Sequence, residues 1–119
     1  MIFNNIFQGK KVLITGNTGF KGSWLTVWLL RLGAQIIGIS KDIPTSPSMF
    51  EDLDLKSKIK NYSIDIIEQD LVREIISNEK PDFIFHLAAQ AIVSVSYEAS
   101  FETMNTNIMG TASILESLK

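Results

Sequence analysis

Short apolar runs alternate along this chain with longer segments whose apolar residues recur at helical spacing. The first run, at 11–15, is continuous rather than alternating, which is typical of a strand buried on both faces of a parallel sheet. The pattern predicts four strands, at 11–15, 35–40, 62–64 and 82–87. It predicts helices at 20–32 and 49–55, from residue 65 up to Pro81, and at 101–119.

Strands that alternate with helices in this way indicate a doubly wound α/β fold with a parallel sheet. Right-handed crossovers then give the strand order 3-2-1-4. The sequence stops where a fifth strand would begin, so the sheet is expected to be incomplete, with the apolar fourth strand at an unpaired edge. A chain of 119 residues amounts to one domain at most.

Residue spacing also predicts local features of the helices. The apolar residues of helix 20–32 lie on nearly all of its sides, so the sheet and neighbouring elements should both cover it. Asp65 and Glu68 have the spacing of a capping box that opens the third long helix. The last helix carries an apolar stripe that serves either the core or a subunit interface: Met104, Ile108, Ala112 and Leu115.

Three glycines occupy the predicted turn between the first strand and the first helix, at the spacing G-x-x-G-x-x-G. Gly16 permits the tight turn, Gly19 leaves room for backbone N–H groups to approach a diphosphate, and Gly22 lets the helix lie close to the strand. The helix N-terminus favours an anion. The turn therefore predicts a Rossmann-type dinucleotide site, with a purely structural turn as the alternative. The absence of Gly-Lys-Ser/Thr excludes a P-loop.

An acidic residue near the end of the second strand would bind the adenosine ribose hydroxyls. Asp42 follows Gly22 by about twenty residues, the usual interval. The alternative is that Asp42 is only a turn residue before Pro44. Ser40 and Lys41 would tolerate a 2′-phosphate, which leaves NADP open beside NAD.

Polar and small residues end the third and fourth strands. Asp65 can cap a helix and, with Ile66, lie beside an adenine. Small residues at 88–91 leave space where a cofactor must pass the sheet. His86, inside an apolar strand, fits a hydrogen-bonded packing residue better than a catalytic base. Asn107 either hydrogen-bonds toward the nicotinamide half of a dinucleotide or is satisfied by backbone.

Composition narrows the class of partner. The net charge is −2 with acidic and basic residues interspersed, so no basic block indicates nucleic acid and no amphipathic basic face indicates a membrane surface. The absence of cysteine excludes disulfides and thiolate zinc sites, and no metal site is predicted. The N-terminus has no secretory signal pattern, so the cytoplasm is the expected compartment.

Several motifs occur together: GKKVLITG at 9–16, TGFKGSWL at 18–25, PTSPSMFE at 44–51, HLAAQ at 86–90 and TNIMGT at 106–111. With these motifs the chain resembles the extended short-chain dehydrogenase/reductase superfamily and, within it, the CDP-glucose 4,6-dehydratase family. The likeness covers essentially the whole chain. The FKGSW and PTSPS segments distinguish that family from its relatives.

The resemblance implies a lyase with a tightly held NAD that is reduced and reoxidised within one turnover. A tyrosine would accept the proton of the sugar 4-hydroxyl, and an acid–base pair would eliminate water across C5–C6. The product would be CDP-4-dehydro-6-deoxyglucose, used in polysaccharide biosynthesis, and the full-length protein would be a homodimer. The family's cofactor contacts fall on Gly16, Thr18, Gly19, Phe20, Lys21, Gly22, Asp42, Asp65, Ile66, Leu87, Ala88, Ala89 and Asn107.

The sequence departs from the family at three points. The family usually has His where Asn17 stands and Pro where Ser100 stands, and neither change threatens the turn. Its Tyr-x-x-x-Lys pair is absent, because Ile66 follows Tyr62 and Phe101 follows Tyr97 at that spacing. We therefore expect residues 1–119 to be the N-terminal part of an NAD(P)-binding Rossmann domain, inactive alone, with the catalytic residues and the substrate domain outside this chain. The alternatives are a non-catalytic dinucleotide-binding module, or a related epimerase or dehydratase acting on another nucleotide sugar.

Overall fold

Four parallel strands form the centre of the molecule in the computed structural model, which describes residues 2–119. They are β1 (Lys11–Thr15), β2 (Gln35–Ser40), β3 (Lys60–Ser63) and β4 (Phe83–His86). The strand order is β3-β2-β1-β4, as the sequence predicts. β1 pairs with β2 on one side and with β4 on the other, and Val12, Leu13 and Ile14 are fully buried between them.

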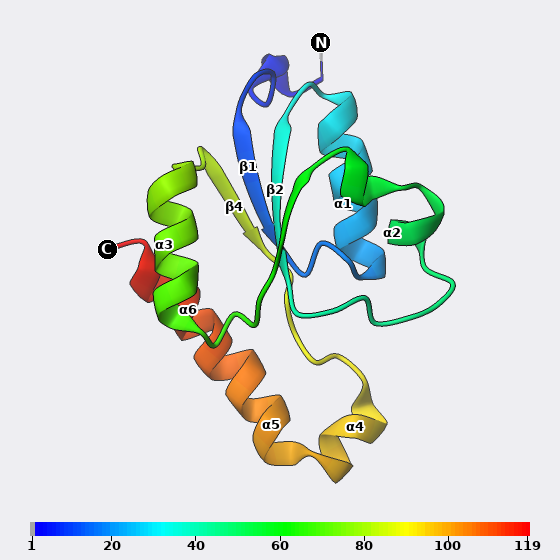
Figure 1. The fold of residues 1–119 in the computed structure, drawn as a ribbon, viewed down its shortest axis with the longest axis vertical. Coiled ribbons are helices and arrows are strands. Elements are labelled where there is room, and N and C mark those ends of the chain that lie inside the picture. Colours follow the sequence, from blue (N-terminus) through cyan, green and yellow to red (C-terminus); the bar gives the residue numbers. More distant parts are fainter. Residues whose placement is uncertain (1) are drawn as a thin grey trace.

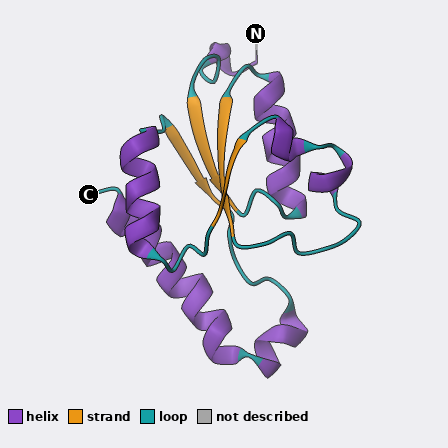
Figure 2. Cartoon of the chain, viewed as in Figure 1, coloured by secondary structure: helices purple, strands orange, loops and turns teal. Residues whose placement is uncertain are grey.

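Helices cover both faces of the sheet, which confirms the doubly wound fold (Figures 1 and 2). The helical elements are η1 (Ile2–Asn5), α1 (Phe20–Arg31), α2 (Met49–Asp52), η2 (Leu55–Ser57), α3 (Gln69–Glu79), α4 (Val93–Glu98), α5 (Ser100–Met104), η3 (Asn105–Met109) and α6 (Gly110–Ser117). One core cluster joins Leu13 and Ile37 to α3 and to Ile114 of α6, and the other joins Ile14 and Ile36 to α1. The arm formed by α4 and α5 extends beyond the carboxyl ends of the strands (Figure 1).

The prediction that α1 is covered all round was wrong. Its buried face consists mainly of small residues, Gly22, Ser23 and Thr26, with Leu29. Trp24 remains 56% exposed. Small residues let the helix axis approach the sheet closely, which leaves its large side chains on the outer faces.

The predicted capping box at the start of α3 was also wrong. The helix begins at Gln69, and its N-cap residue Glu68 makes no side-chain cap. Asp65 instead accepts a hydrogen bond from the Ile67 amide at 3.2 Å, an Asx-type turn. Strand β3 ends at Ser63, one residue earlier than predicted, so Asp65 lies in the turn that leaves the sheet.

The single helix predicted over 101–119 has three consecutive parts in the structure, α5, η3 and α6, of which η3 is π-helical. The preceding α4 was not predicted. In the predicted stripe, Met104, Ile108 and Leu115 are 57%, 54% and 62% exposed, so they are not part of this chain's core.

Candidate functional site

The carboxyl ends of the strands lie at one edge of the sheet, where Thr15, Ser40, Ser63 and His86 close them. From β1 the sheet continues to β2 on one side and to β4 on the other. Ligands of doubly wound sheets bind outside the carboxyl ends, at the point where the strand order reverses. The glycine turn leaves β1 at this point.

Gly16 and Gly22 have the two roles that the sequence predicts for them. Gly16 has φ +71°, and a Cβ there would lie 2.8 Å from the Ala88 nitrogen and 2.9 Å from the Leu87 carbonyl carbon. A Cβ on Gly22 would overlap the Gly16 carbonyl and lie 2.8 Å from the Asn17 Cα. The turn, the start of α1 and the segment after β4 are therefore in direct backbone contact.

The N-terminus of α1 is open to a ligand. Within residues 2–119, the amides of Phe20, Lys21 and Gly22 donate to no protein acceptor. The N-cap residue Gly19 provides no side chain, and the first turn contains no acidic residue. A Cβ on Gly19 would meet only the Gly16 carbonyl oxygen, at 3.5 Å, so it would project into open space. Unpaired amides at the positive end of a 12-residue helix are an arrangement that favours an anion.

Hydrogen bonds fix the turn in this open shape. The Gly16 amide donates to the Ile39 carbonyl at 2.8 Å, which ties the turn to β2. The Thr18 hydroxyl donates to the Asp42 carbonyl, so the loop after β2 lies beside the turn. The carboxylate of Asp42 is exposed and has no partner among the described residues, which leaves it available to a ligand.

The fully buried Asn17 side chain supports the turn from the interior of the protein. It fills the space next to Gly38, where a Cβ would lie 2.5 Å from the Asn17 Cγ. Its Nδ2 donates to Asn61 Oδ1 at 2.9 Å, while its Oδ1 has no partner among the described residues. This side chain belongs to the support of the site rather than to its open face.

Asp65 and Ile66 lie at the same edge of the sheet, but they differ in which of their groups a ligand could contact. The Asp65 carboxylate, which already accepts from the Ile67 amide, is also 3.9 Å from the Lys41 ammonium. Ile66 is 4% exposed, and its Cδ1 occupies the space that Gly110 leaves by having no side chain. Ile66 therefore offers only its main chain to a ligand, since its side chain is part of the core.

The segment after β4 borders the turn. Ala88 contacts Gly16, while Leu87 is 41% exposed and Ala89 is exposed. Asn107 holds the end of this segment: its Oδ1 accepts from the Gln90 amide at 2.8 Å, and its Nδ2 donates to the Gln90 carbonyl at 3.1 Å. Of the two predicted roles for Asn107, the structure therefore has the one satisfied by backbone.

His86 is hydrogen-bonded at both ring nitrogens, as expected for a packing residue. Nδ1 lies 2.7 Å from the Thr15 hydroxyl and Nε2 lies 3.0 Å from the Thr111 hydroxyl. Burial lowers the pKa of the imidazole and favours its neutral form. Sequence reasoning missed Thr15 and Thr111 as the hydrogen-bond partners of His86. The available signal was a polar residue ending an apolar strand, and a threonine four residues after Asn107 on the same helix face.

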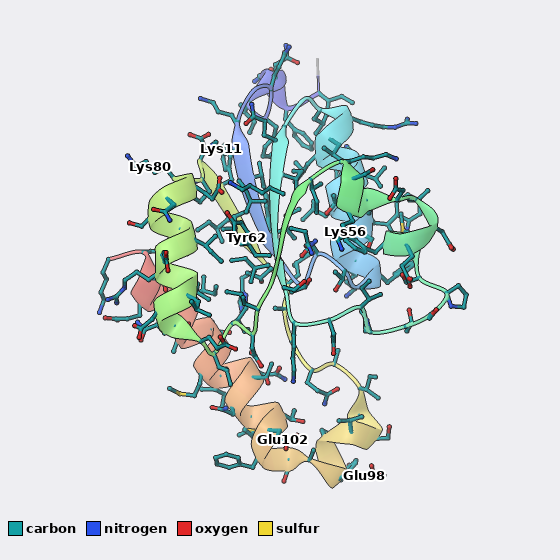
Figure 3. All side chains as sticks on the ribbon, viewed as in Figure 1. Lys11, Lys56, Tyr62, Lys80, Glu98 and Glu102 are labelled. Carbon is teal, nitrogen blue, oxygen red and sulfur yellow. The ribbon has the colours of Figure 1, made fainter. Side chains whose placement is uncertain are left out.

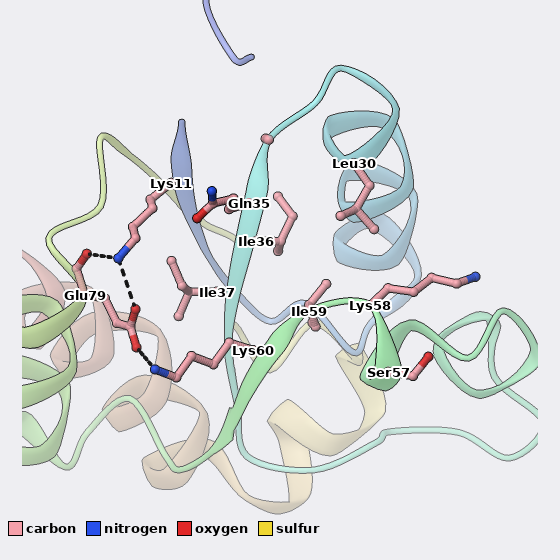
Figure 4. Close-up of a pocket in the computed structure, with 11 residues that line it drawn as sticks. Lys11, Leu30, Gln35, Ile36, Ile37, Ser57, Lys58, Ile59, Lys60 and Glu79 are labelled. Carbon is pink, nitrogen blue, oxygen red and sulfur yellow. Dashed lines mark hydrogen bonds and ion pairs between the residues drawn. The ribbon is translucent and has the colours of Figure 1, made fainter. Parts of the chain in front are cut away.

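A second polar cluster lies at the opposite, amino edge of the sheet, beside a cavity of about 540 Å³ (Figure 4). Glu79 of α3, 7% exposed, pairs there with Lys60 and, at 3.7 Å, with Lys11. It also accepts a 2.6 Å hydrogen bond from the Tyr62 hydroxyl, on the side of the sheet that faces α3 (Figure 3). Hydrogen bonds from Lys60 and Tyr62 lower the pKa of Glu79. The cluster joins α3 to β1 through Lys11 and to β3 through Lys60 and Tyr62, and it is remote from the glycine turn.

The fold and the open glycine turn define a Rossmann-type dinucleotide-binding protein. A family model described as GDP-mannose 4,6 dehydratase matches residues 13–119, and the chain belongs to that family. The chain is 46% identical over all its 119 residues to a CDP-glucose 4,6-dehydratase of Salmonella typhimurium, of which it covers 33%. It is 33% identical over 117 residues to a GDP-mannose 4,6-dehydratase of Vibrio cholerae, covering 92% of this chain and 31% of the relative.

Solved structures of epimerases have the same fold. An epimerase of Methanothermobacter thermautotrophicus matches with a TM-score of 0.81 at 29% identity, over 95% of this chain and 32% of the other. The UDP-glucose 4-epimerase of Thermus thermophilus, in complex with NAD, matches with a TM-score of 0.76 at 26% identity, over 90% of this chain and 33% of the other. The chain thus spans about a third of the length of the proteins it matches.

Within residues 2–119, no helix is long and apolar enough to cross a membrane. These residues also contain no group of three or more His, Cys, Asp or Glu side chains that could hold a metal ion.

Proposed function

We propose that this chain is the N-terminal, NAD-binding part of a nucleotide-sugar 4,6-dehydratase that acts on CDP-glucose. The observation that carries the proposal is the set of three unpaired amides at the start of α1, placed at the carboxyl edge of a parallel sheet. The 46% identity to a CDP-glucose 4,6-dehydratase over the whole chain supports the choice of substrate.

The residues around the turn fit a dinucleotide. The amides of 20–22 would hold the diphosphate, with Gly16, Thr18 and Gly19 shaping the loop around it. The exposed Asp42 carboxylate would accept hydrogen bonds from the ribose hydroxyls.

The remaining cofactor contacts would come from the ends of β3 and β4. Asp65 and the main chain of Ile66 would border the adenine, since the Ile66 side chain is buried in the core. Leu87, Ala88 and Ala89 would border the rest of the cofactor. Asn107 would act through Gln90, because both its polar groups bind that residue's backbone.

NAD supplies reversible hydride transfer when bound. The residues of this chain would bind and orient it, since none of them forms the Tyr-x-x-x-Lys pair of the family. The proton-transfer residues and the sugar site would lie in the rest of a longer protein. Residues 1–119 alone should therefore give no turnover of CDP-glucose, and measurable turnover by the pure chain would contradict this assignment.

Calorimetric titration with NAD and NADP tests the cofactor assignment. The wild type should prefer NAD, because the Asp42 carboxylate would repel a 2′-phosphate. Asp42→Ala should weaken NAD binding by about 10-fold, the cost of losing hydrogen bonds to a charged group, and reduce the preference over NADP. Glu51→Ala, an exposed acid on α2, is the control and should bind as the wild type does. Equal affinity of the wild type for the two cofactors would contradict the role of Asp42.

We further propose that the full-length protein is a homodimer that uses the exposed apolar stripe of the last helices. Met104, Ile108 and Leu115 support this proposal, since each exposes more than half of its surface. Light scattering of the full-length protein should give the mass of two chains. Ile108→Glu should give one, and a wild-type monomer would contradict the proposal.

A second candidate is an epimerase that acts on a different nucleotide sugar, which the likeness to UDP-glucose 4-epimerase structures favours. Incubation of the full-length protein with CDP-glucose and with UDP-glucose separates the two. A 4-dehydro-6-deoxy product from CDP-glucose supports the dehydratase, whereas conversion of UDP-glucose to its 4-epimer supports the epimerase.

A further inference from the structure

A continuous series of side-chain hydrogen bonds joins the end of β1 to the last helix. The Thr15 hydroxyl lies 2.7 Å from His86 Nδ1, and His86 Nε2 lies 3.0 Å from the Thr111 hydroxyl. The Thr111 hydroxyl donates in turn to the Asn107 carbonyl at 2.9 Å. The series therefore crosses from the sheet, through the imidazole, to the π-helical segment η3.

The number of protons that each side chain can donate fixes which atom donates and which accepts in every hydrogen bond of this series. Thr111 has one hydroxyl proton and gives it to the Asn107 carbonyl, so its oxygen accepts from His86 Nε2–H. Neutral His86 then has only a lone pair on Nδ1, which accepts from the Thr15 hydroxyl. The Thr15 hydroxyl oxygen is left with two lone pairs, which accept from the amides of residues 87 and 88 at 3.0 and 3.1 Å, and the Leu87 amide is shared with the Thr15 carbonyl at 3.1 Å.

These two amides belong to the segment that lies against the glycine turn, where the Ala88 nitrogen is 2.8 Å from the position of a Cβ on Gly16. The other end of the segment is held by the side chain of Asn107, through both backbone groups of Gln90. The last helix thus holds the 87–90 segment at both ends. It does so directly through Asn107 and indirectly through the hydrogen-bond series.

We propose that Thr15, His86 and Thr111 are positioning residues, which hold the 87–90 segment against the glycine turn through the Nε2–H tautomer of His86. The inference rests on the proposed dinucleotide site, because its effect on binding requires a cofactor beside that segment. The three side chains act through the segment's backbone rather than by touching the cofactor.

Nitrogen-15 NMR of the sole histidine tests the direction of the series. We expect a pyrrole-type signal for Nε2 and a pyridine-type signal for Nδ1 at neutral pH. A proton on Nδ1 would overturn the proposal, because the Thr15 hydroxyl would then accept from the imidazole, in competition with the amides of residues 87 and 88, instead of donating to it. This result does not depend on whether the chain binds NAD.

Calorimetric titration with NAD tests the positioning role. Thr111→Val leaves His86 Nε2–H without an acceptor at nearly constant volume, and binding should be about 3- to 10-fold weaker, as for one lost hydrogen bond. Thr111→Ser retains the hydroxyl and should restore wild-type binding. Thr106→Val is the matched control, since the Thr106 side chain makes no hydrogen bond within residues 2–119.

The outcomes distinguish the positioning role of the three side chains from the proposed function of the chain. Equal binding by the Thr111→Val and Thr106→Val variants would overturn the positioning role, as would failure of Thr111→Ser to restore binding. Thr15→Ser is a second variant, which keeps its hydroxyl and should retain both the Nε2–H tautomer and the affinity. A wild type that does not bind NAD contradicts the proposed function, whereas an Nδ1–H tautomer contradicts only this inference.

Discussion

Gly19 and Gly22 lie in the same turn, yet a methyl group at each should have a different effect. Gly22→Ala places Cβ against the Gly16 carbonyl and should destabilise the fold by about 1–3 kcal/mol, the usual cost of overpacking. Gly19→Ala meets only one atom at ordinary contact distance and should cost less than about 1 kcal/mol. Urea unfolding of both variants measures the difference.

The Gly19→Ala and Gly22→Ala variants also distinguish an effect on folding from an effect on cofactor binding. Gly19 is the N-cap residue of α1 and its Cβ would project into open space, so in Gly19→Ala NAD binding should be lost although the fold remains stable. Calorimetric titration of that variant provides the check. Undiminished NAD binding by a well-folded Gly19→Ala variant would mean that the diphosphate lies elsewhere.

His86 should make stability depend on pH in a defined direction. Because burial lowers its pKa below the ordinary 6.5, the unfolded chain takes up this proton before the folded chain does. The full contribution is present above about pH 6.5, and it should be lost progressively as the pH falls from there to the folded-state pKa. Urea unfolding at a series of pH values should reveal this decline, and His86→Asn should abolish it. The same decline in His86→Asn would exclude His86 as its source.

At the scale of single residues, the sequence predicted the roles of Gly16 and Gly22 because those roles depend on local backbone geometry. The role of Asn107 could be predicted only as one of two alternatives. Its actual partner, the backbone of Gln90, is seventeen residues away in the sequence, and contacts between segments of irregular backbone leave no periodic signal. Ile66 was predicted as a cofactor contact, but its side chain packs against Gly110, and spacing alone does not reveal that contact.

At the scale of elements, α3 is attached to the sheet by a charged cluster at the end remote from the turn. Glu79→Gln retains the side-chain volume but removes the charge that Lys60 and Lys11 neutralise. Stability at pH 7 should fall by about 1–2 kcal/mol, in the range for hydrogen bonds to a charged group. NAD affinity should be unchanged, because the cluster lies at the opposite edge of the sheet. Denaturant unfolding and calorimetry measure the two effects.

The loss of folding stability at acidic pH provides a second test of the role of the Glu79 cluster. Hydrogen bonds from Lys60 and Tyr62 lower the pKa of Glu79 below 4.5, so its contribution is present above that pH and is lost as the pH falls through the folded-state pKa. Glu79→Gln should remove this loss. Glu74→Gln, an exposed position on the same helix, should change stability by no more than about 0.5 kcal/mol. A similar loss of stability in both variants would contradict the role of the cluster.

Elements with strong periodicity were predictable, and those set by tertiary contacts were not. β1 and β2 have the predicted bounds, because continuous apolar runs between turn residues define them. The division of the last helix was not predictable, since the π-helical η3 occurs where Asn107 binds the segment after β4. A π-helical turn of this kind is frequent at functional sites.

At the scale of the whole molecule, the strand order followed from the alternation of strands and helices, together with the handedness of their connections. The exposed stripe on the last helices could not be assigned in the same way, because the sequence pattern of a core face and of an interface is the same. The family relationship supports the proposed activity, while the geometry of this chain supports only its cofactor-binding half.

The most direct test of the central claim is to map the amide resonances of the chain during titration with NAD. The account predicts that the largest shifts occur at Phe20, Lys21 and Gly22, with smaller ones at Leu87 and Ala88. Amides near Glu79, at the other edge of the sheet, should not move. Unchanged resonances at the start of α1 when NAD is saturating, or shifts concentrated around Glu79, would contradict the account.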